Sequence, residues 1–142
     1  MAGIGIATAR TIIRATLAKG REAGMKPLTV VVLDAGGHVV AVEREDGSSA
    51  GRFDIARGKA HGSIMLGIPG SAQQARADQQ AYFVQAMNGL FDGRFVPVKG
   101  GLLVRDGTGA LIGAVGVSGD TSDNDALAGA AGIEAAGLVA EA

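Results

Sequence analysis

The sequence predicts an α+β domain in which helices pack on a central antiparallel β-sheet. Helical and strand patterns follow one another in the order α, ββ, αα, ββ, α, and both strand pairs have the form of hairpins. The 142 residues suffice for one core, so we expect a single domain over 1–142. With 47% hydrophobic and only 4% aromatic residues, that core must consist of Ala, Val, Ile and Leu.

The first helix and the first hairpin are predicted over residues 6–46. Apolar residues at helical spacing indicate a helix over 6–23, which Gly24 ends and Pro27 prevents from continuing. The β-branched stretch "LTVVVLD" at 28–34 predicts a strand covered on both faces. "AGGH" then turns the chain into "HVVAVERED", which completes an antiparallel hairpin.

The middle of the chain is predicted to be helical. The stretch 52–66 forms a helix with a buried stripe, and a second helical pattern follows over 71–90 after "GIPGS". The stretch "FDGRFVPVKGG" is expected to be a loop or irregular strand. The expected buried stripe of the first of these helices is Phe53, Ala56, Ala60 and Ile64.

A second hairpin and a final helix complete the prediction. "LLVRDGTGALIGAVGVSG" contains the turn "DGTG" and a long apolar return strand over 110–118. Ser122 or Asp123 is expected to cap the last helix, with Asp125 in its first turn. The Gly- and Ala-rich stretch 126–140 continues that helix and permits close contact between subunits.

The composition excludes several classes of protein. A net charge of −1 argues against nucleic acid as a partner, because phosphate neutralisation needs an excess of basic residues. Without cysteine there are no disulfides, thiolate nucleophiles or cysteine metal sites. No apolar run is long enough to span a bilayer, and Arg10 and Arg14 interrupt any signal-peptide pattern. We therefore expect a cytoplasmic protein with no membrane contact.

The stretch "DIARGKAHGS" at 54–63 is the main candidate for chemistry. On a helix, Asp54, Arg57 and His61 share a face at i, i+3 and i+7 and are the candidate catalytic residues. Lys59 points elsewhere and is a candidate for binding the ligand. A carboxylate near an imidazole can hold its tautomer and raise its basicity, and Arg57 could bind an acidic group. The alternative is a solvent-exposed Asp–Arg pair with a surface histidine beside it.

Further candidate ligand-binding groups lie outside that helix. Arg44 and Asp46 share a face at the end of a strand, where side chains commonly enter a pocket. Lys99 and the backbone N–H groups of Gly100 and Gly101 could form a cradle for a carboxylate. That stretch lacks the spacing of a P-loop, so we do not interpret it as a nucleotide site.

The two histidines are the candidates for a cofactor ligand. His38 ends the "DAGGH" turn and His61 lies on the predicted helix, and either could be the axial ligand of a haem. They lie far apart in the sequence without HxH or HExxH spacing, so we expect no metal site made by side chains alone. No GxSxG motif surrounds Ser118, which leaves covalent catalysis without support.

The sequence resembles the GlcG/HbpS (DUF336) family of haem-binding-like proteins over residues 6–138. The resemblance rests on three motifs in order: "VVVLDAGGHVVAVEREDG", "DIARGKAHGS" and "KGGLLVRDGTGALIGAVGVSGDTSDNDALAGAAG". It implies a profilin-like fold, assembly into dimers, tetramers or octamers, and a pocket beside the 52–66 helix. Some members of this family bind haem. This chain has His61 and Gly62 where an aromatic residue and Thr are common, and Lys99 where Pro is common.

Three functions are consistent with these observations. The first is a small-ligand or haem-binding protein, homo-oligomeric and associated with a catabolic pathway, with its pocket between the sheet and the 52–66 helix. The second is a cofactor-independent isomerase, hydratase or lyase for a small acidic metabolite, with His61 as the base and Lys99, Arg44 or Arg57 holding the anion. The third is an accessory or structural subunit without a ligand.

Overall fold

The structure, a computed structural model, describes residues 3–142 as five helices and five strands. The helices are α1 (Ile6–Glu22), α2 (Arg52–Leu66), α3 (Gly70–Gln79), α4 (Ala81–Leu90) and α5 (Ser122–Ala135). The strands are β1 (Thr29–Asp34), β2 (Val39–Arg44), β3 (Gly101–Arg105), β4 (Leu111–Ser118) and β5 (Val139–Glu141). No helix within residues 3–142 is both long and apolar enough to cross a membrane.

The five strands form one antiparallel sheet in the order β2-β1-β4-β3-β5. The two predicted hairpins are the β1–β2 and β3–β4 pairs, and the pairing of β1 with β4 joins them. Residues 29–33 of β1 are all buried, as its continuous apolar pattern predicts. The predicted α+β class with a central antiparallel sheet is therefore confirmed.

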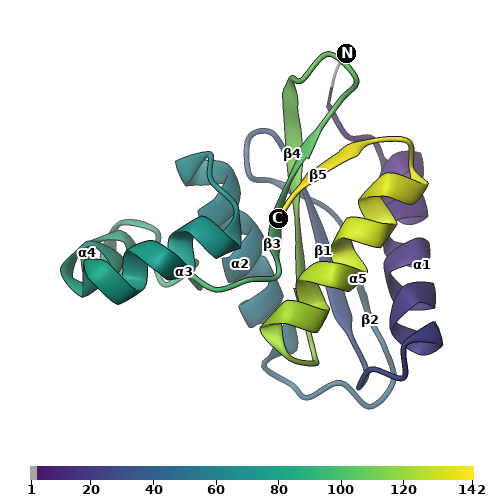
Figure 1. The fold of residues 1–142 in the computed structure, drawn as a ribbon, viewed down its shortest axis with the longest axis horizontal. Helices are drawn as coiled ribbons and strands as arrows, with labels where there is room; N and C mark the ends of the chain where they lie inside the picture. The colour runs from purple at the N-terminus through teal and green to yellow at the C-terminus, as the bar shows by residue number, and fades with distance from the viewer. Residues whose placement is uncertain (1–2) are drawn as a thin grey trace.

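Helices cover both faces of the sheet (Figure 1). Helices α1 and α5 pack against one another on one face, and α2 packs on the other. Because strand side chains alternate between faces, Val30 and Val32 join the core beneath α1 and α5. Val31 and Leu33 join a smaller core with Ala56, Ala60 and Ile64 of α2. The sheet therefore separates two apolar layers.

Helices α3 and α4 form an arm that extends from the body beside α2 (Figure 1). The expectation of one continuous helix over 71–90 is wrong, because Gln80 leaves helical geometry with φ −137° and ψ 66°. Arg76 stabilises the break: its Nε donates to Gln80 Oε1 at 3.1 Å, and its guanidinium lies 3.5 Å from the centre of the Phe83 ring. Helix α4 has no buried residue.

The C-terminal segment also differs from the prediction. The last helix ends at Ala135 rather than continuing to residue 140, and Gly137 adopts φ +76° beyond it. The chain then pairs with β3 as the short strand β5, which the helical pattern did not predict. The cap is Thr121, not Ser122 or Asp123, and its hydroxyl accepts a hydrogen bond from Asn124 N–H at 3.2 Å.

Helix α2 lies directly on the backbone of the sheet. A Cβ added at Gly116 of β4 would clash with the carbonyl oxygen of Ala56, and one at Gly101 of β3 would clash with that of Lys59. This close approach needs residues without side chains. The backbone of α2 thus contacts the sheet directly at Gly101 and Gly116, which leaves no room for a pocket there. The expectation of a pocket between the 52–66 helix and the sheet is wrong for this part of the interface.

We expect Gly116→Ala to lower the free energy of unfolding by at least about 2 kcal/mol, because the added methyl must displace helix backbone. Urea denaturation measures the change. Gly107→Ala is the matched control, since a Cβ there meets nothing within 4 Å, and its effect should stay below about 0.5 kcal/mol. Equal stability of the two variants would contradict the close contact.

Candidate functional site

Helix α2 carries Asp54, Arg57, Lys59 and His61 of the residues singled out from the sequence, and it is covered on two sides. The sheet lies on one side, and all residues from 58 to 64 are buried. A Cβ at Gly58 would meet the Val96 side chain, and one at Gly62 would meet the Phe95 ring. The segment after α4, which contains Phe95 and Val96, therefore packs on a face of α2 that the predicted buried stripe does not include. The buried surface of α2 is wider than the predicted single stripe.

His61 lies between α2 and that segment. Its Nδ1 is 2.9 Å from the carbonyl oxygen of Arg94, and its ring meets Phe91 edge-on at a centroid distance of 5.4 Å. Because a carbonyl oxygen only accepts hydrogen bonds, Nδ1 carries the proton and Nε2 of the neutral ring keeps its lone pair. Nε2 has no hydrogen-bond partner within residues 3–142.

Burial lowers the pKa of His61, and the nearby charges of Arg94 and Arg57 lower it further, against the opposing effect of the Arg94 hydrogen bond. The imidazole is thus kept in its neutral form. The residue as a whole is only 8% exposed. The structure therefore presents a fixed, uncharged imidazole with one nitrogen available as a base or a ligand.

Arg57 and Arg94 place two guanidinium groups beside this ring. The Nε atoms of both are buried and have no hydrogen-bond partner within the described residues. Asp54, expected on the same face as Arg57 and His61, is exposed and forms no ion pair within residues 3–142. We call His61, Arg57, Arg94 and Phe91 the His61 cluster. It is basic and only partly satisfied, which suits a ligand with carboxylate groups.

The β1–β2 turn closes one side of the His61 cluster. A Cβ at Gly37 would lie 3.7 Å from His61 Cδ2, so the turn backbone approaches the ring closely. His38 follows in the chain, but its side chain is 81% exposed. Its Nδ1 lies 3.2 Å from Asp34 Oδ1. His38 is therefore a surface residue next to the cluster rather than a part of it.

Lys59, expected to bind a ligand, is instead a core residue. Its Nζ donates to Asp125 Oδ2 at 3.1 Å and to the carbonyl oxygen of Val117 at 2.9 Å. The exposed fractions of the two paired side chains are 3% and 1%. Burial lowers the pKa of Lys59, and the Asp125 carboxylate opposes this shift. The two hydrogen bonds and the burial make this a structural ion pair rather than a ligand contact.

The groups expected to bind a carboxylate around Lys99 do not lie together: the Lys99 side chain is at the surface, and the backbone of Gly100 and Gly101 is buried. Lys99 Nζ forms an exposed ion pair with Asp123 at 2.8 Å beside a cavity of about 410 Å³. Gly100 and Gly101 are buried, and a Cβ on Gly100 would meet the Nζ of Lys59. Their backbone thus packs beneath α2, which is at odds with an open anion cradle at these glycines.

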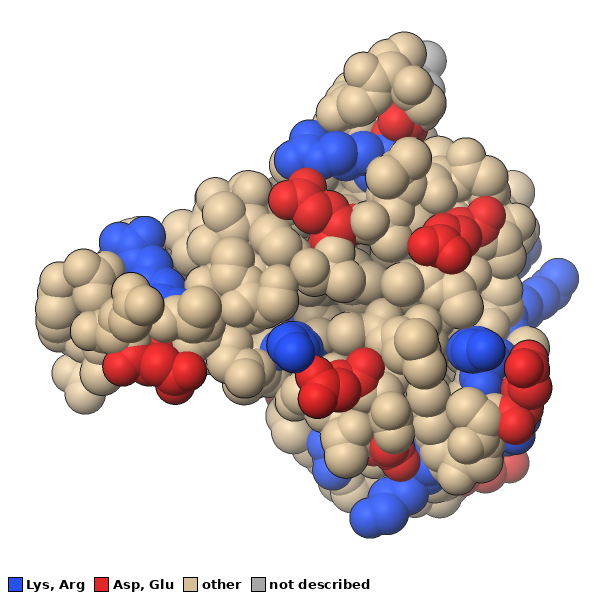
Figure 2. Space-filling view, viewed as in Figure 1, with Lys and Arg blue, Asp and Glu red and all other residues tan. Residues whose placement is uncertain are grey.

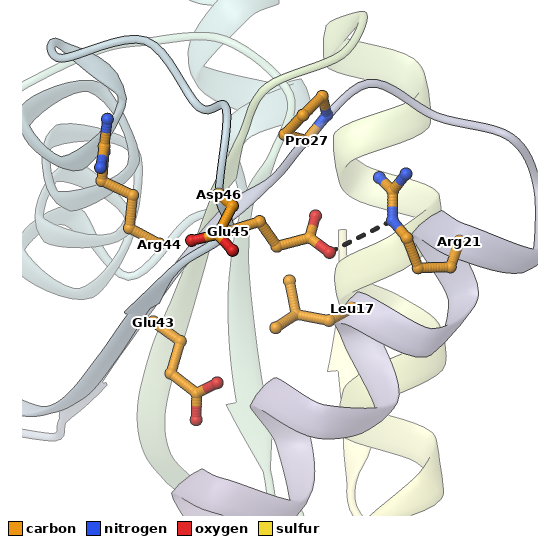
Figure 3. Close-up of a pocket in the computed structure, with 7 residues that line it drawn as sticks. All are labelled: Leu17, Arg21, Pro27, Glu43, Arg44, Glu45 and Asp46. Atoms are coloured by element: carbon orange, nitrogen blue, oxygen red, sulfur yellow. Dashed lines mark ion pairs between the residues drawn. The ribbon is translucent and has the colours of Figure 1, made fainter.

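Arg44 and Asp46 line a separate cavity of about 420 Å³ between the C-terminal end of α1 and the end of β2 (Figure 3). Arg21 Nε pairs with Glu45 Oε2 across it at 3.2 Å. The guanidinium of Arg44 points away from that pair and donates to the carbonyl oxygen of Ser48. The expected anion holders Arg44 and Lys99 therefore line two cavities that share no lining residue, and neither cavity includes His61.

Sequence reasoning missed Arg94 and Phe91, which complete the His61 cluster. The stretch "FDGRFVPVKGG" was expected to be only a loop or irregular strand, and the structure confirms that residues 91–100 form no helix or strand. One signal was present: two of the four phenylalanines flank Arg94 within five residues. Their contact with α2 depends on the tertiary fold.

Basic and acidic side chains lie close to one another over most of the face shown in Figure 2. Two ion pairs, Lys99–Asp123 and Arg105–Glu141, have N–O distances of 2.8 and 2.9 Å. That face carries no continuous basic surface of the kind that follows a nucleic-acid backbone.

Comparison with known proteins identifies both a family and a fold. Residues 4–134 match the family described as haem degrading protein HbpS-like. A protein of Citrobacter freundii, described as an uncharacterised 15.0 kDa protein in the dhaT-dhaS intergenic region, is 33% identical over 129 residues. That match covers 89% of this chain and 87% of the relative.

Solved structures share the fold at lower identity. The PduOC–haem complex has a TM-score of 0.86 at 18% identity and is covered over 99% of both chains. Klebsiella pneumoniae ORFY has a TM-score of 0.84 at 24% identity, over 96% of this chain and 92% of that one. HbpS has a TM-score of 0.81 at 21% identity, over 94% and 90% of the two chains.

We expect Lys59→Met to lower the free energy of unfolding by about 3–5 kcal/mol, because it leaves the Asp125 carboxylate buried without its partner. Lys59→Met combined with Asp125→Asn should recover about 1–2 kcal/mol of that loss. Lys99→Met, which breaks an exposed pair, is the control and should cost less than about 1 kcal/mol. Urea denaturation of the four proteins tests this, and similar losses for both lysines would refute the structural role of Lys59.

Proposed function

Since this chain belongs to the HbpS-like family of haem-degrading proteins, we propose that it binds haem, or a ligand of the same planar and acidic kind, at the His61 cluster. One observation carries the proposal: His61 is a neutral, buried imidazole whose Nδ1 is anchored to a carbonyl and whose Nε2 is free. The presence of haem in the structurally similar PduOC complex supports the choice of ligand.

The residues of the cluster fit the chemical needs of a haem. An axial imidazole ligand binds iron through one nitrogen while the other donates to a carbonyl or carboxylate, which fixes the orientation of the ring. His61 already makes that second contact, with Arg94. The buried Nε atoms of Arg57 and Arg94 lack partners, and guanidinium groups pair well with carboxylates such as haem propionates. Phe91 supplies apolar surface next to the imidazole.

The protein residues would divide the work of binding in a simple way. His61 would hold the iron, the two arginines would orient the carboxylate edge, and Phe91 would exclude water from one side of the imidazole. The bound haem would supply the redox and ligand-binding chemistry of its iron. His38 is the weaker candidate for holding the iron because it is exposed and its Nδ1 contacts Asp34.

A haemin titration followed by Soret absorbance tests the proposal. Wild-type protein should show saturable one-site binding, and His61→Ala should weaken it at least about tenfold with loss of the wild-type Soret band. His38→Ala is the matched control and should stay within about twofold. Arg57→Gln should weaken binding while retaining the wild-type band, because it removes a carboxylate partner and keeps the iron ligand.

Circular dichroism must show that each variant keeps the wild-type fold. If folded His61→Ala binds haemin as the wild type does, the assignment of His61 is wrong. Non-saturating binding by the wild type itself would overturn the proposed haem function.

The pH dependence of binding gives an independent check. Protonation of the imidazole competes with iron for Nε2, so affinity is lost as the pH falls through the pKa of His61 in the folded protein. Because burial lowers that pKa, half of the haemin affinity should be lost at a pH below 6.5, the pKa of an unperturbed histidine. Titrations in a pH series measure this, and a midpoint above pH 6.5 would contradict a desolvated His61 ligand.

A further inference from the structure

A small cavity lies at the N-terminal end of α2, and none of its lining residues belongs to the His61 cluster. Its volume is about 180 Å³, and the residues that carry the argument below are Lys26, Ser48, Ser49 and Arg52. Pockets for drug-sized ligands usually start at about 300 Å³, so this cavity suits a small ion or a single chemical group. Gly47 and Gly119 form other parts of its wall.

Ser48 is the buried polar residue of this wall. It is 6% exposed, and its Oγ has no hydrogen-bond partner within residues 3–142. Leaving a buried hydroxyl unpaired costs free energy, and native proteins rarely leave such groups without an explanation. An oxygen ligand in the cavity would accept this hydrogen bond after a rotation about one side-chain torsion.

Arg52 is held in place at the same cavity. Its Nε donates to Ser49 Oγ at 3.2 Å, and its Nη1 donates to Ser118 Oγ at 3.0 Å. These contacts fix the plane of the guanidinium and leave Nη2 without a partner within the described residues. Lys26 adds a second cation, and its ammonium forms no ion pair within residues 3–142.

Helix α2 begins beside this cavity, and Arg52, its first residue, lines it. Helix α2 is 15 residues long, starts after Gly51 and has no side-chain cap. The backbone N–H groups of Phe53 and Asp54 have no acceptor within the described residues. Uncapped N–H groups and the helix dipole favour an anion at such an end.

Besides Asp54 in the first turn of α2, two nearby carboxylates accept hydrogen bonds within the fold. Asp120 accepts hydrogen bonds from the backbone N–H of Lys26 at 2.9 Å and from the Asn124 amide at 2.7 Å. Glu45 accepts from the backbone N–H of Leu28 at 2.7 Å and pairs with Arg21. Neither carboxylate forms an ion pair with Lys26 or Arg52 within residues 3–142. The hydrogen bonds from the Lys26 N–H and the Asn124 amide lower the pKa of Asp120 to about 2, and the Lys26 charge contributes, so Asp120 is ionised and interacts with Lys26. Arg52 has no such carboxylate partner within the described residues and remains available to a ligand.

We propose that this cavity binds a tetrahedral oxyanion, either inorganic phosphate or the phosphate group of a small ester. The donors that line the cavity are the Ser48 hydroxyl, the Arg52 guanidinium and the Lys26 ammonium. Together these groups offer more hydrogen-bond donors than the two oxygens of a carboxylate can accept. Their number suits the several oxygens of a phosphate group. The site is independent of the His61 cluster.

Isothermal titration calorimetry with inorganic phosphate and with phenyl phosphate tests the proposal in a chloride-containing buffer free of other oxyanions. Wild-type protein should bind one equivalent of at least one probe, and tighter binding of phenyl phosphate would assign the ester as the preferred source. Ser48→Ala and Arg52→Gln should each weaken binding about tenfold, because each removes a hydrogen bond to a charged group.

Arg14→Gln is the matched control. Arg14 is exposed on α1 and forms no ion pair within residues 3–142, so this variant changes the net charge equally without touching the cavity. Ser48→Ala removes a hydroxyl that has no partner, so it should keep its thermal stability, and that variant stays informative if Arg52→Gln fails to fold. Absence of binding by the wild type, or equal weakening by Arg14→Gln, would overturn the proposed site.

Discussion

The buried ion pair between Lys59 and Asp125 is the contact on which the arrangement of the layers depends. It joins α2, on one face of the sheet, to the first turn of α5, on the other, and Lys59 also donates to the carbonyl oxygen of Val117 near the end of β4. Asp125 in turn accepts from the backbone N–H of Asp120. Removing either charge would leave the other desolvated, so both helices must keep their positions relative to the sheet.

This constraint determines what the rest of α2 can do. With Lys59 directed into the core and Gly116 allowing backbone contact at Ala56, the helix cannot separate from the sheet to admit a ligand. Its ligand-binding capacity must therefore lie on the other side or at its ends. His61, two residues after Lys59, is directed toward Arg94 and Phe91, and Arg52 lies at the first turn beside the small cavity.

The two proposed sites use different physical means to bind acidic groups. The His61 cluster combines a neutral imidazole with two guanidinium groups whose buried Nε atoms have no partner among the described residues, in a partly apolar setting. The cavity at the start of α2 combines a buried hydroxyl with two cations. The first arrangement suits a large planar ligand with carboxylates, and the second suits a small oxyanion.

Local patterns in the sequence determined the helix over 52–66, both hairpins, the buried strand β1 and the placing of Arg57 and His61 on one helix, because helical and strand periodicities act over a few residues. Tertiary structure decided the pairing of β5 with β3, the burial of Lys59 and the contact of His61 with Arg94. Lys59 and His61 each have a partner more than 30 residues away. A lysine or histidine becomes a core residue or a ligand according to the group that the fold places beside it, and helical spacing carries no information about that group.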